Sequence, residues 1–146
     1  MAEDLKELTR TYIDQVWNQG KLDLIDQLVA PGCLTHDPAA PGGVLTGPEG
    51  LKQLVSMYRT AFPDTKFALQ DLVEEGDKVA ARISASGTHK GALMGIEPTG
   101  KRVSISGIVI TQFRDGKQVE SWSSYDQLGM LQQLGVAPAL QPASTN

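Results

Sequence analysis

Asp126 has the clearest chemical setting in the chain. It stands where an expected strand meets an expected helix, in the stretch ESWSSYDQLGMLQQLG (residues 120–135). Side chains alternate along a regular strand, so Glu120, Trp122, Ser124 and Asp126 would share one face. This mixture of acids, an indole and a hydroxyl predicts a partly polar small-molecule pocket. Burial beside the indole would raise the pKa of Asp126 towards that of an acid/base catalyst, while the alternative role is an N-cap of the helix; the two are compatible.

The two histidines are further candidates for proton chemistry. His36, in THDP, is expected either on the cavity wall, bonded to a substrate carbonyl, or in a plain loop where its neighbour Asp37 starts a turn. His89, at the end of a strand, is expected either at the cavity mouth or in solvent. Neither has metal-site spacing such as H-E-x-x-H, so no metal is expected.

Bulky side chains on the expected helices could close the pocket. Aromatic rings and methionine give large apolar contacts, and Tyr and Trp add one polar end. The predicted substrate-binding residues of this type are Tyr12, Trp17, Met57, Tyr58 and Trp122, and Ser124 adds a hydroxyl. Both tryptophans could equally be core residues. The one cysteine, Cys33, is expected to be a small buried residue.

Three helices are expected in the first half of the chain. An apolar stripe at spacings of three and four predicts a helix over residues 3–19, and a second, short one lies at 22–29. Residues 31–46 are rich in Pro and Gly and predict a loop, with at most a short extended piece at 34–36. A third helix is expected from a Thr46–Glu49 capping box to Pro63.

Strands follow, because the apolar period changes to two. The expected strands cover residues 65–74, 79–89, 101–114 and 117–126, with a hairpin turn at Asp115–Gly116 and a bulge at Gly107. A last short helix covers 127–134. Helices followed by a meandering sheet predict an α+β domain, with the helices packed on one face of a curved antiparallel sheet.

Composition limits the function classes. The chain has 146 residues, of which 40% are hydrophobic, and a net charge of −4, so one soluble domain is expected and no nucleic-acid partner. The N-terminal stretch lacks the pattern of a signal peptide, and no stretch is long enough to span a membrane, which predicts a cytoplasmic protein. The domain is expected to cover residues 1–136, with a flexible tail at 137–146.

Two segments resemble the SnoaL-like polyketide cyclase family of the nuclear-transport-factor-2-like superfamily. They are YIDQVWNQGKLDLIDQLVAPGCLTHDP and the stretch from GTHKGALMGIEPTGK to residue 135. The most specific parts are GIEPTGK and the spacing E-x-W-x-x-x-D-x-x-x-x-x-x-Q-L-G. The resemblance covers residues 5–135. It implies a cone-shaped α+β barrel with a deep cavity between the helices and the sheet, and homodimers formed through the sheet.

The resemblance also implies a reaction. Characterised cyclases of this family close a ring by intramolecular aldol condensation without cofactor or metal, on a hydrophobic carbonyl substrate. Their catalytic aspartate matches Asp126 here. A histidine on the preceding strand assists in some members, and Gln112 occupies about that place in this chain.

Two alternatives to a cyclase or isomerase stay open. In the first, the same cavity binds a hydrophobic small molecule without catalysis, and Asp126 is only a cap and a hydrogen-bond partner. The second is an epoxide-hydrolase-like enzyme, which needs an Asp–Arg–Asp group in the cavity. Arg82 could supply its arginine only if the strand register were opposite to the one expected.

Overall fold

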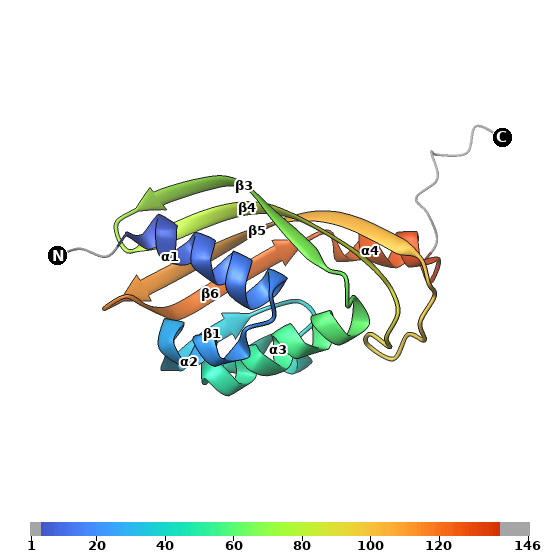
Figure 1. Ribbon diagram of the computed structural model, residues 1–146, viewed down its shortest axis with the longest axis horizontal. Coiled ribbons are helices and arrows are strands. Elements are labelled where there is room, and N and C mark those ends of the chain that lie inside the picture. The colour runs from blue at the N-terminus through green and yellow to red at the C-terminus, as the bar shows by residue number, and fades with distance from the viewer. Residues whose placement is uncertain (1–3, 138–146) are drawn as a thin grey trace.

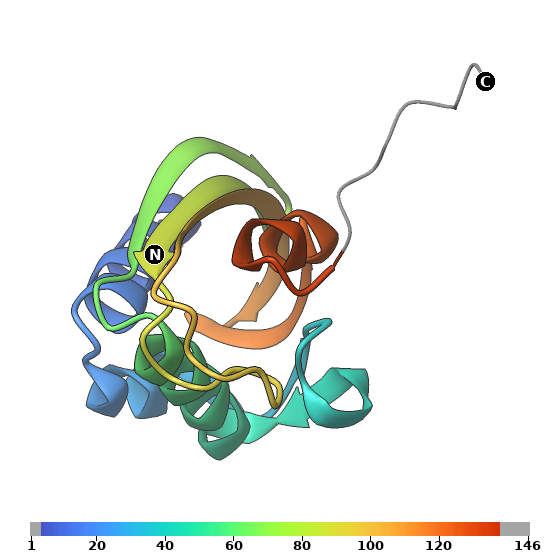
Figure 2. The same ribbon diagram turned by 90° about the vertical axis from the view of Figure 1, so that its right-hand side faces the viewer.

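A mixed six-stranded sheet forms the body of the computed structural model, which describes residues 4–137 (Figure 1). The strand order is β2-β1-β6-β5-β4-β3, and only β1 and β6 run parallel. The bounds are β1 Val29–His36, β2 Val44–Thr46, β3 Lys66–Glu75, β4 Lys78–Thr88, β5 Arg102–Arg114 and β6 Lys117–Tyr125. Figure 2 shows this sheet curling into an incomplete ring. The α+β class expected from the sequence is confirmed.

Helices lie against the concave side of the sheet and at its rim (Figures 1 and 2). Helix α1 (Leu5–Thr11) continues into a π-helical segment, η1 (Tyr12–Asn18), and α3 (Gly47–Ala61) is the longest helix. The others are η2 Leu22–Leu24, α2 Ile25–Leu28, η3 Pro41–Gly43 and α4 Gln127–Leu134. Most of the expected helical positions are therefore confirmed, whereas the predicted tail falls almost entirely on residues 138–146, outside the described part.

The main error in the predicted elements is strand β1. Residues 31–46 were expected to be mostly loop, yet the strand runs through Pro31 and Gly32 and pairs with β6. Its register shifts between Val29 and Leu34, so these two breakers occupy the irregular part of the ladder, where proline is tolerated. The sequence expectation of four strands was thus too low by β1 and β2.

Turn chemistry explains the β5–β6 hairpin. Asp115 and Gly116 have φ values of 54° and 75°, the positive values that a tight hairpin turn requires, and the predicted turn is confirmed. The predicted bulge at Gly107 is wrong, because the register shifts between Gln112 and Phe113 instead. The predicted capping box is also wrong in its chemistry, since Thr46 precedes α3 but its side chain makes no capping hydrogen bond.

Two apolar clusters hold the helices to the sheet. The first joins η1, α2, β1 and α3 through Val16, Ile25, Cys33, Leu51 and Val55, and the burial expected for Cys33 is confirmed. The second fixes α4 and the 89–101 loop against the end of α3, through Phe62, Leu93, Val103, Met130 and Leu134. Burying one such side chain typically contributes about 1.5–3 kcal/mol.

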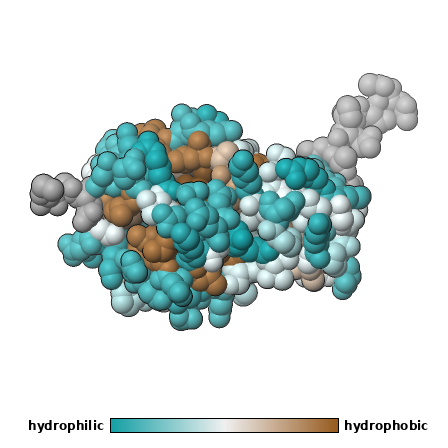
Figure 3. All heavy atoms as spheres, viewed as in Figure 1, coloured by the Kyte–Doolittle hydropathy of each residue, from teal (hydrophilic) through white to brown (hydrophobic). Residues whose placement is uncertain are grey.

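The surface carries hydrophobic side chains in separate groups. On the face shown in Figure 3, these groups are divided by hydrophilic residues, and the end towards α4 is neutral to hydrophilic. None of the helices in residues 4–137 has the length and apolar character needed to cross a membrane.

Candidate active site

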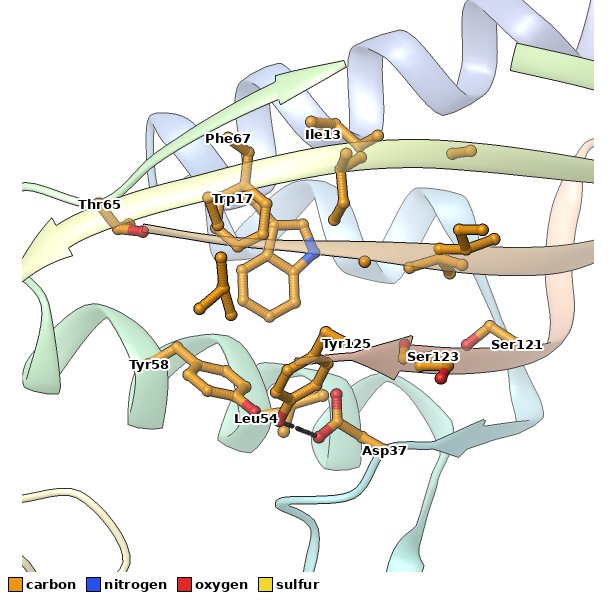
Figure 4. A pocket seen from close by; sticks show the side chains of 18 of the residues that line it. Ile13, Trp17, Asp37, Leu54, Tyr58, Thr65, Phe67, Ser121, Ser123 and Tyr125 are labelled. Atoms are coloured by element: carbon orange, nitrogen blue, oxygen red, sulfur yellow. Dashed lines mark hydrogen bonds between the residues drawn. The ribbon is translucent and has the colours of Figure 1, made fainter. Parts of the chain in front are cut away.

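A cavity lies between the concave face of the sheet and the helices (Figure 4). Its volume is about 120 Å³, counted as space for the centres of water-sized molecules. The apolar part of the lining includes Ile13, Trp17, Leu54, Phe62, Phe67, Ile83, Val103, Ile105, Val109 and Met130. Because one water needs only about 10–15 Å³ on this measure, the cavity can hold a ring-containing ligand.

Asp37 is the carboxyl group on the cavity wall. Its residue is only 6% exposed, and Oδ1 accepts hydrogen bonds from the backbone N–H of Ala39 (2.8 Å) and from the hydroxyls of Tyr58 (3.2 Å) and Tyr125 (3.1 Å). The two tyrosine hydroxyls also contact each other. Since these bonds all go to Oδ1, the second carboxyl oxygen is left for a ligand, and Figure 4 shows the group beside both phenols.

Burial sets the protonation of this cluster. It raises the pKa of Asp37 above its ordinary 3.8, although the hydrogen bonds from Ala39, Tyr125 and Tyr58 lower it in part. Burial also raises the pKa of both tyrosines above 10, and the Asp37 charge raises it further. The phenols therefore stay protonated as donors, while the carboxylate is a stronger base than an exposed aspartate.

Neighbouring elements fix the three side chains. Asp37 directly follows β1, and its bond to Ala39 holds the carboxyl group through a local turn of the Asx type. Tyr125 ends β6, opposite Gly107 on β5. A Cβ on Gly107 would lie 2.6 Å from the Cβ of Tyr125, so glycine at this position lets the tyrosine lean over β5.

The π-helical segment η1 is tied down next to the cavity. Asn18 bonds the backbone of Phe67 through both its amide atoms (2.7 and 3.0 Å), and Arg59 donates to the Trp17 and Asn18 carbonyls (2.7 and 3.0 Å). Trp17 consequently packs against Phe67, with ring centroids 5.0 Å apart. π-Helical turns are rare and often accompany functional sites.

Four of the predicted substrate-binding residues line this cavity. They are Tyr12, Trp17, Tyr58 and Ser124, although Ser124 is exposed and lies on the same strand face as Trp122. Burial raises the pKa of Tyr12, which keeps its phenol protonated. Met57 instead packs against both apolar clusters and is outside the lining.

The predicted inner face of β6 is wrong. Ser121, Ser123 and Tyr125 line the cavity, whereas Trp122 is on the outer face, stacked on His36 at 5.7 Å with nearly parallel rings. Ser121 and Ser123 point inward, where small side chains leave space for the cavity, and Trp122 packs against His36 on the outer face. The aromatic residue was therefore a poor guide to the inner face.

The outward placement also corrects two other candidates. His36 Nε2 pairs with Glu120 (2.7 Å) outside the cavity lining, rather than on the expected cavity wall. Gln112 pairs with Asp77 (2.9 Å) and is likewise outside the lining. Arg82, also exposed, bonds Asp71 and Gln70, so it gives the cavity no Asp–Arg–Asp group.

Asp126 is exposed and caps α4. Its Oδ1 accepts the Gly129 N–H at 2.8 Å, and the residue is outside the cavity lining. The expected capping role is confirmed, whereas the expected position at the pocket edge is wrong. Its side chain points outward because it shares the strand face of Trp122.

His89 is fully buried, not solvated. Its Nδ1 accepts a hydrogen bond from the Thr99 N–H (3.1 Å), so the ring proton is on Nε2. The ring centroids of His89 and Phe62 are 5.5 Å apart. Among the described side chains, Nε2 of His89 is the polar atom sealed from solvent without a partner. The residue is outside the cavity lining, so its expected position at the cavity mouth is wrong.

Sequence reasoning missed Asp37 and treated it only as a turn residue. One signal was present in the sequence. Cys33, Thr35 and Asp37 are alternate residues, so on a strand they would share one face, and Cys33 and Thr35 are buried on that face of β1. That pattern is readable only once β1 is known to be a strand. In residues 4–137 no three His, Cys, Asp or Glu side chains form a possible metal site.

Comparison with known proteins gives a consistent family. The family model described as SnoaL-like polyketide cyclase matches residues 7–134. A nogalonic acid methyl ester cyclase of Streptomyces nogalater is 33% identical over 82% of this chain and 89% of its own. The aklanonic acid methyl ester cyclase DnrD of Streptomyces peucetius is 30% identical over 88% and 89%.

Solved structures share the fold. TsrD from Streptomyces laurentii superposes with a TM-score of 0.81 at 29% identity, covering 93% of this chain and 99% of its own. IdmH, a putative polyketide cyclase from Streptomyces antibioticus, gives a TM-score of 0.78 at 32% identity, covering 92% and 100%.

Proposed function

The chain belongs to the SnoaL-like polyketide cyclase family, and from that premise we propose that Asp37, Tyr58 and Tyr125 carry out a cofactor-free aldol cyclisation. The single observation that supports this assignment is the buried Asp37 carboxyl group on the cavity wall, bonded through Oδ1 to both phenols. A family cyclase needs a base and proton donors at one place, and this cluster supplies both.

The proposed steps balance without any other reactant. Asp37 takes a proton from the carbon next to a substrate carbonyl. Each tyrosine has one hydroxyl proton, which it donates to Asp37 while that group is ionised; once Asp37 is protonated, the hydroxyls turn and donate hydrogen bonds to the enolate oxygen. The enolate carbon attacks a second carbonyl of the same molecule and forms a carbon–carbon bond. The protonated Asp37 then returns its proton to the new alkoxide, so the product is an isomer of the substrate.

The proposed substrate is a neutral, hydrophobic polyketide ester. A free carboxylate beside Asp37 would place two like charges together, whereas an ester avoids that repulsion. The apolar lining contacts rings or chains, and the relatives' names, cyclases of nogalonic and aklanonic acid methyl esters, point to the same class.

The direct test is turnover of such esters by the purified protein alone. We expect a product of unchanged mass and different retention time, and in D₂O we expect exchange at the carbon next to the reacting carbonyl. Heat-denatured protein is the control. Tight binding of the esters with neither cyclisation nor exchange would overturn the proposal and leave the binding-module alternative.

We also propose that two copies associate through the outer face of β1, β6 and β5. Leu34, Ile110 and Trp122 are 36–40% exposed there, and Ile110 is the direct cross-strand neighbour of Trp122. Light scattering should give twice 15.7 kDa for the wild type and the monomer mass for Ile110→Lys. Val73→Lys, at an exposed site on the edge strand β3, is the control, and a monomeric wild type would refute the dimer.

The cytoplasmic location stays a prediction of the sequence.

A further inference from the structure

A second polar group lines the cavity beyond Asp37. Four neutral side chains form it: Thr111 on β5 and Gln118, Ser121 and Ser123 on β6. Ser123 is half-buried, and the other three are buried. We call these four residues the hydroxyl row. Figure 4 shows Ser123 and Ser121 beyond Tyr125 along the same strand. The reaction proposed above does not use them.

Strand register places the row close to the acid. His36 pairs with Trp122 and Thr35 with Ser121, so Asp37 comes alongside Ser123. Ser121 is the next residue on the same face of β6, about 7 Å from Ser123. Thr111 is its direct cross-strand neighbour, at a Cβ separation of about 5 Å.

The side-chain polar atoms of the row have no partner among the described residues, and yet they are accessible to solvent. Within residues 4–137, no hydrogen bond joins the hydroxyls of Thr111, Ser121 and Ser123, or the Gln118 amide, to another protein group. The only sealed side-chain atom without a partner in that range is Nε2 of His89, so the polar atoms of the row are accessible to solvent, and all four residues line the cavity. Buried polar groups are normally satisfied, and a bound molecule would satisfy these.

We propose that the hydroxyl row binds neutral oxygen atoms of the substrate and sets which of its carbonyls faces Asp37. Hydroxyl and amide groups both donate and accept, so they fit hydroxyl or keto oxygens. A substrate oxygenated at both ends would place one oxygen on the row and the reacting carbonyl at the tyrosines. The inference deepens the proposed function, because it takes the cavity to be the substrate site.

A matched pair of fluorescent probes tests this without turnover. One is 2-acetylnaphthalene, and the other is 6-hydroxy-2-acetylnaphthalene, which adds a hydroxyl at the opposite end of the rings from the ketone. Neither has a second carbonyl, so neither can cyclise. We expect the hydroxylated probe to bind the wild type about 10-fold more tightly, a difference of about 1.4 kcal/mol, which is within the usual contribution of one neutral hydrogen bond.

Variants of the row should remove that preference. In the Thr111→Val/Ser121→Ala double variant the ratio of the two dissociation constants should fall below about threefold, with little change for 2-acetylnaphthalene. Either single variant should reduce the ratio in part, and serves if the double variant does not fold. The matched control, Ser84→Ala, removes a hydroxyl of β4 that Gln70 bonds outside the cavity, and should keep the wild-type ratio.

The outcomes separate this inference from the proposed function. Equal affinity of both probes for the wild type, or an unchanged ratio in the double variant, would overturn it and leave the row merely hydrated. If esters are not cyclised but the preference persists and is lost in the double variant, the row stands and the acid/base assignment fails.

Discussion

Two aspartates sit at similar junctions of this fold and have opposite surroundings. Asp37 follows β1, is 6% exposed and accepts hydrogen bonds from two phenols. Asp126 follows β6, is exposed and accepts one backbone N–H of α4. The two strands are parallel neighbours, so the difference comes from which face each side chain takes. A carboxyl group gains basicity from burial among donors, whereas a cap holds only its helix.

Removing the two phenols that bond Asp37 should cause a large loss of turnover. Tyr58→Phe/Tyr125→Phe removes both hydroxyl donors, and kcat should fall by about 10²–10³, the usual cost of losing one oxyanion donor, or by more. Steady-state turnover of a cyclised ester measures it. Tyr12→Phe, which removes a lining phenol that no hydrogen bond joins to Asp37 in the described chain, is the control and should lose less. Equal losses in both variants would contradict a special role of the pair.

The next effect is on the pH dependence of the unfolding free energy, which can be measured without a substrate. Burial raises the folded-state pKa of Asp37, so this group contributes stability below about pH 3.8, and that contribution is lost as pH rises through the folded pKa. Asp37→Asn keeps an acceptor for Ala39 and both tyrosines but cannot ionise. The variant should therefore be more stable relative to wild type at pH 7 than at pH 3.5, in urea unfolding at each pH. A difference independent of pH would refute the raised pKa.

The smallest effect on turnover should come from Asp126. Asp126→Ala removes the cap of α4 and should cost about 1 kcal/mol of unfolding free energy, roughly 3 °C in Tm for a chain of this size. Turnover below the melting range should stay near that of the wild type. Asp126→Ser, which can still cap, should recover most of the lost stability.

Most of the fold could be predicted because it rests on local signals. The apolar stripe of α3, the alternation of β4 and the Asp115–Gly116 turn are each readable within a short window. Strand β1 was missed because its partner, β6, lies about 85 residues further along the chain, and Pro31 and Gly32 hide it locally. Only that parallel pairing brings Asp37 next to Tyr125.

The site was harder to predict than the fold for a physical reason. Trp122 and Asp126 looked like cavity residues because large aromatic and acidic side chains usually mark a pocket. Here the interior of the cavity needs small residues, such as Ser121 and Ser123, and the tryptophan stacks on His36 outside. The face that each β6 side chain takes, which the sequence analysis assigned the wrong way round, decided which carboxyl group could do chemistry.

The most direct test measures kcat/KM of Asp37→Asn and Asp126→Asn side by side on one cyclised ester. Both changes are isosteric, both keep the hydrogen bonds seen at Oδ1, and both remove one carboxylate. We expect Asp37→Asn to lose about 10²–10⁴-fold and Asp126→Asn to stay within about twofold of the wild type. A large loss in Asp126→Asn with full activity in Asp37→Asn would contradict the account.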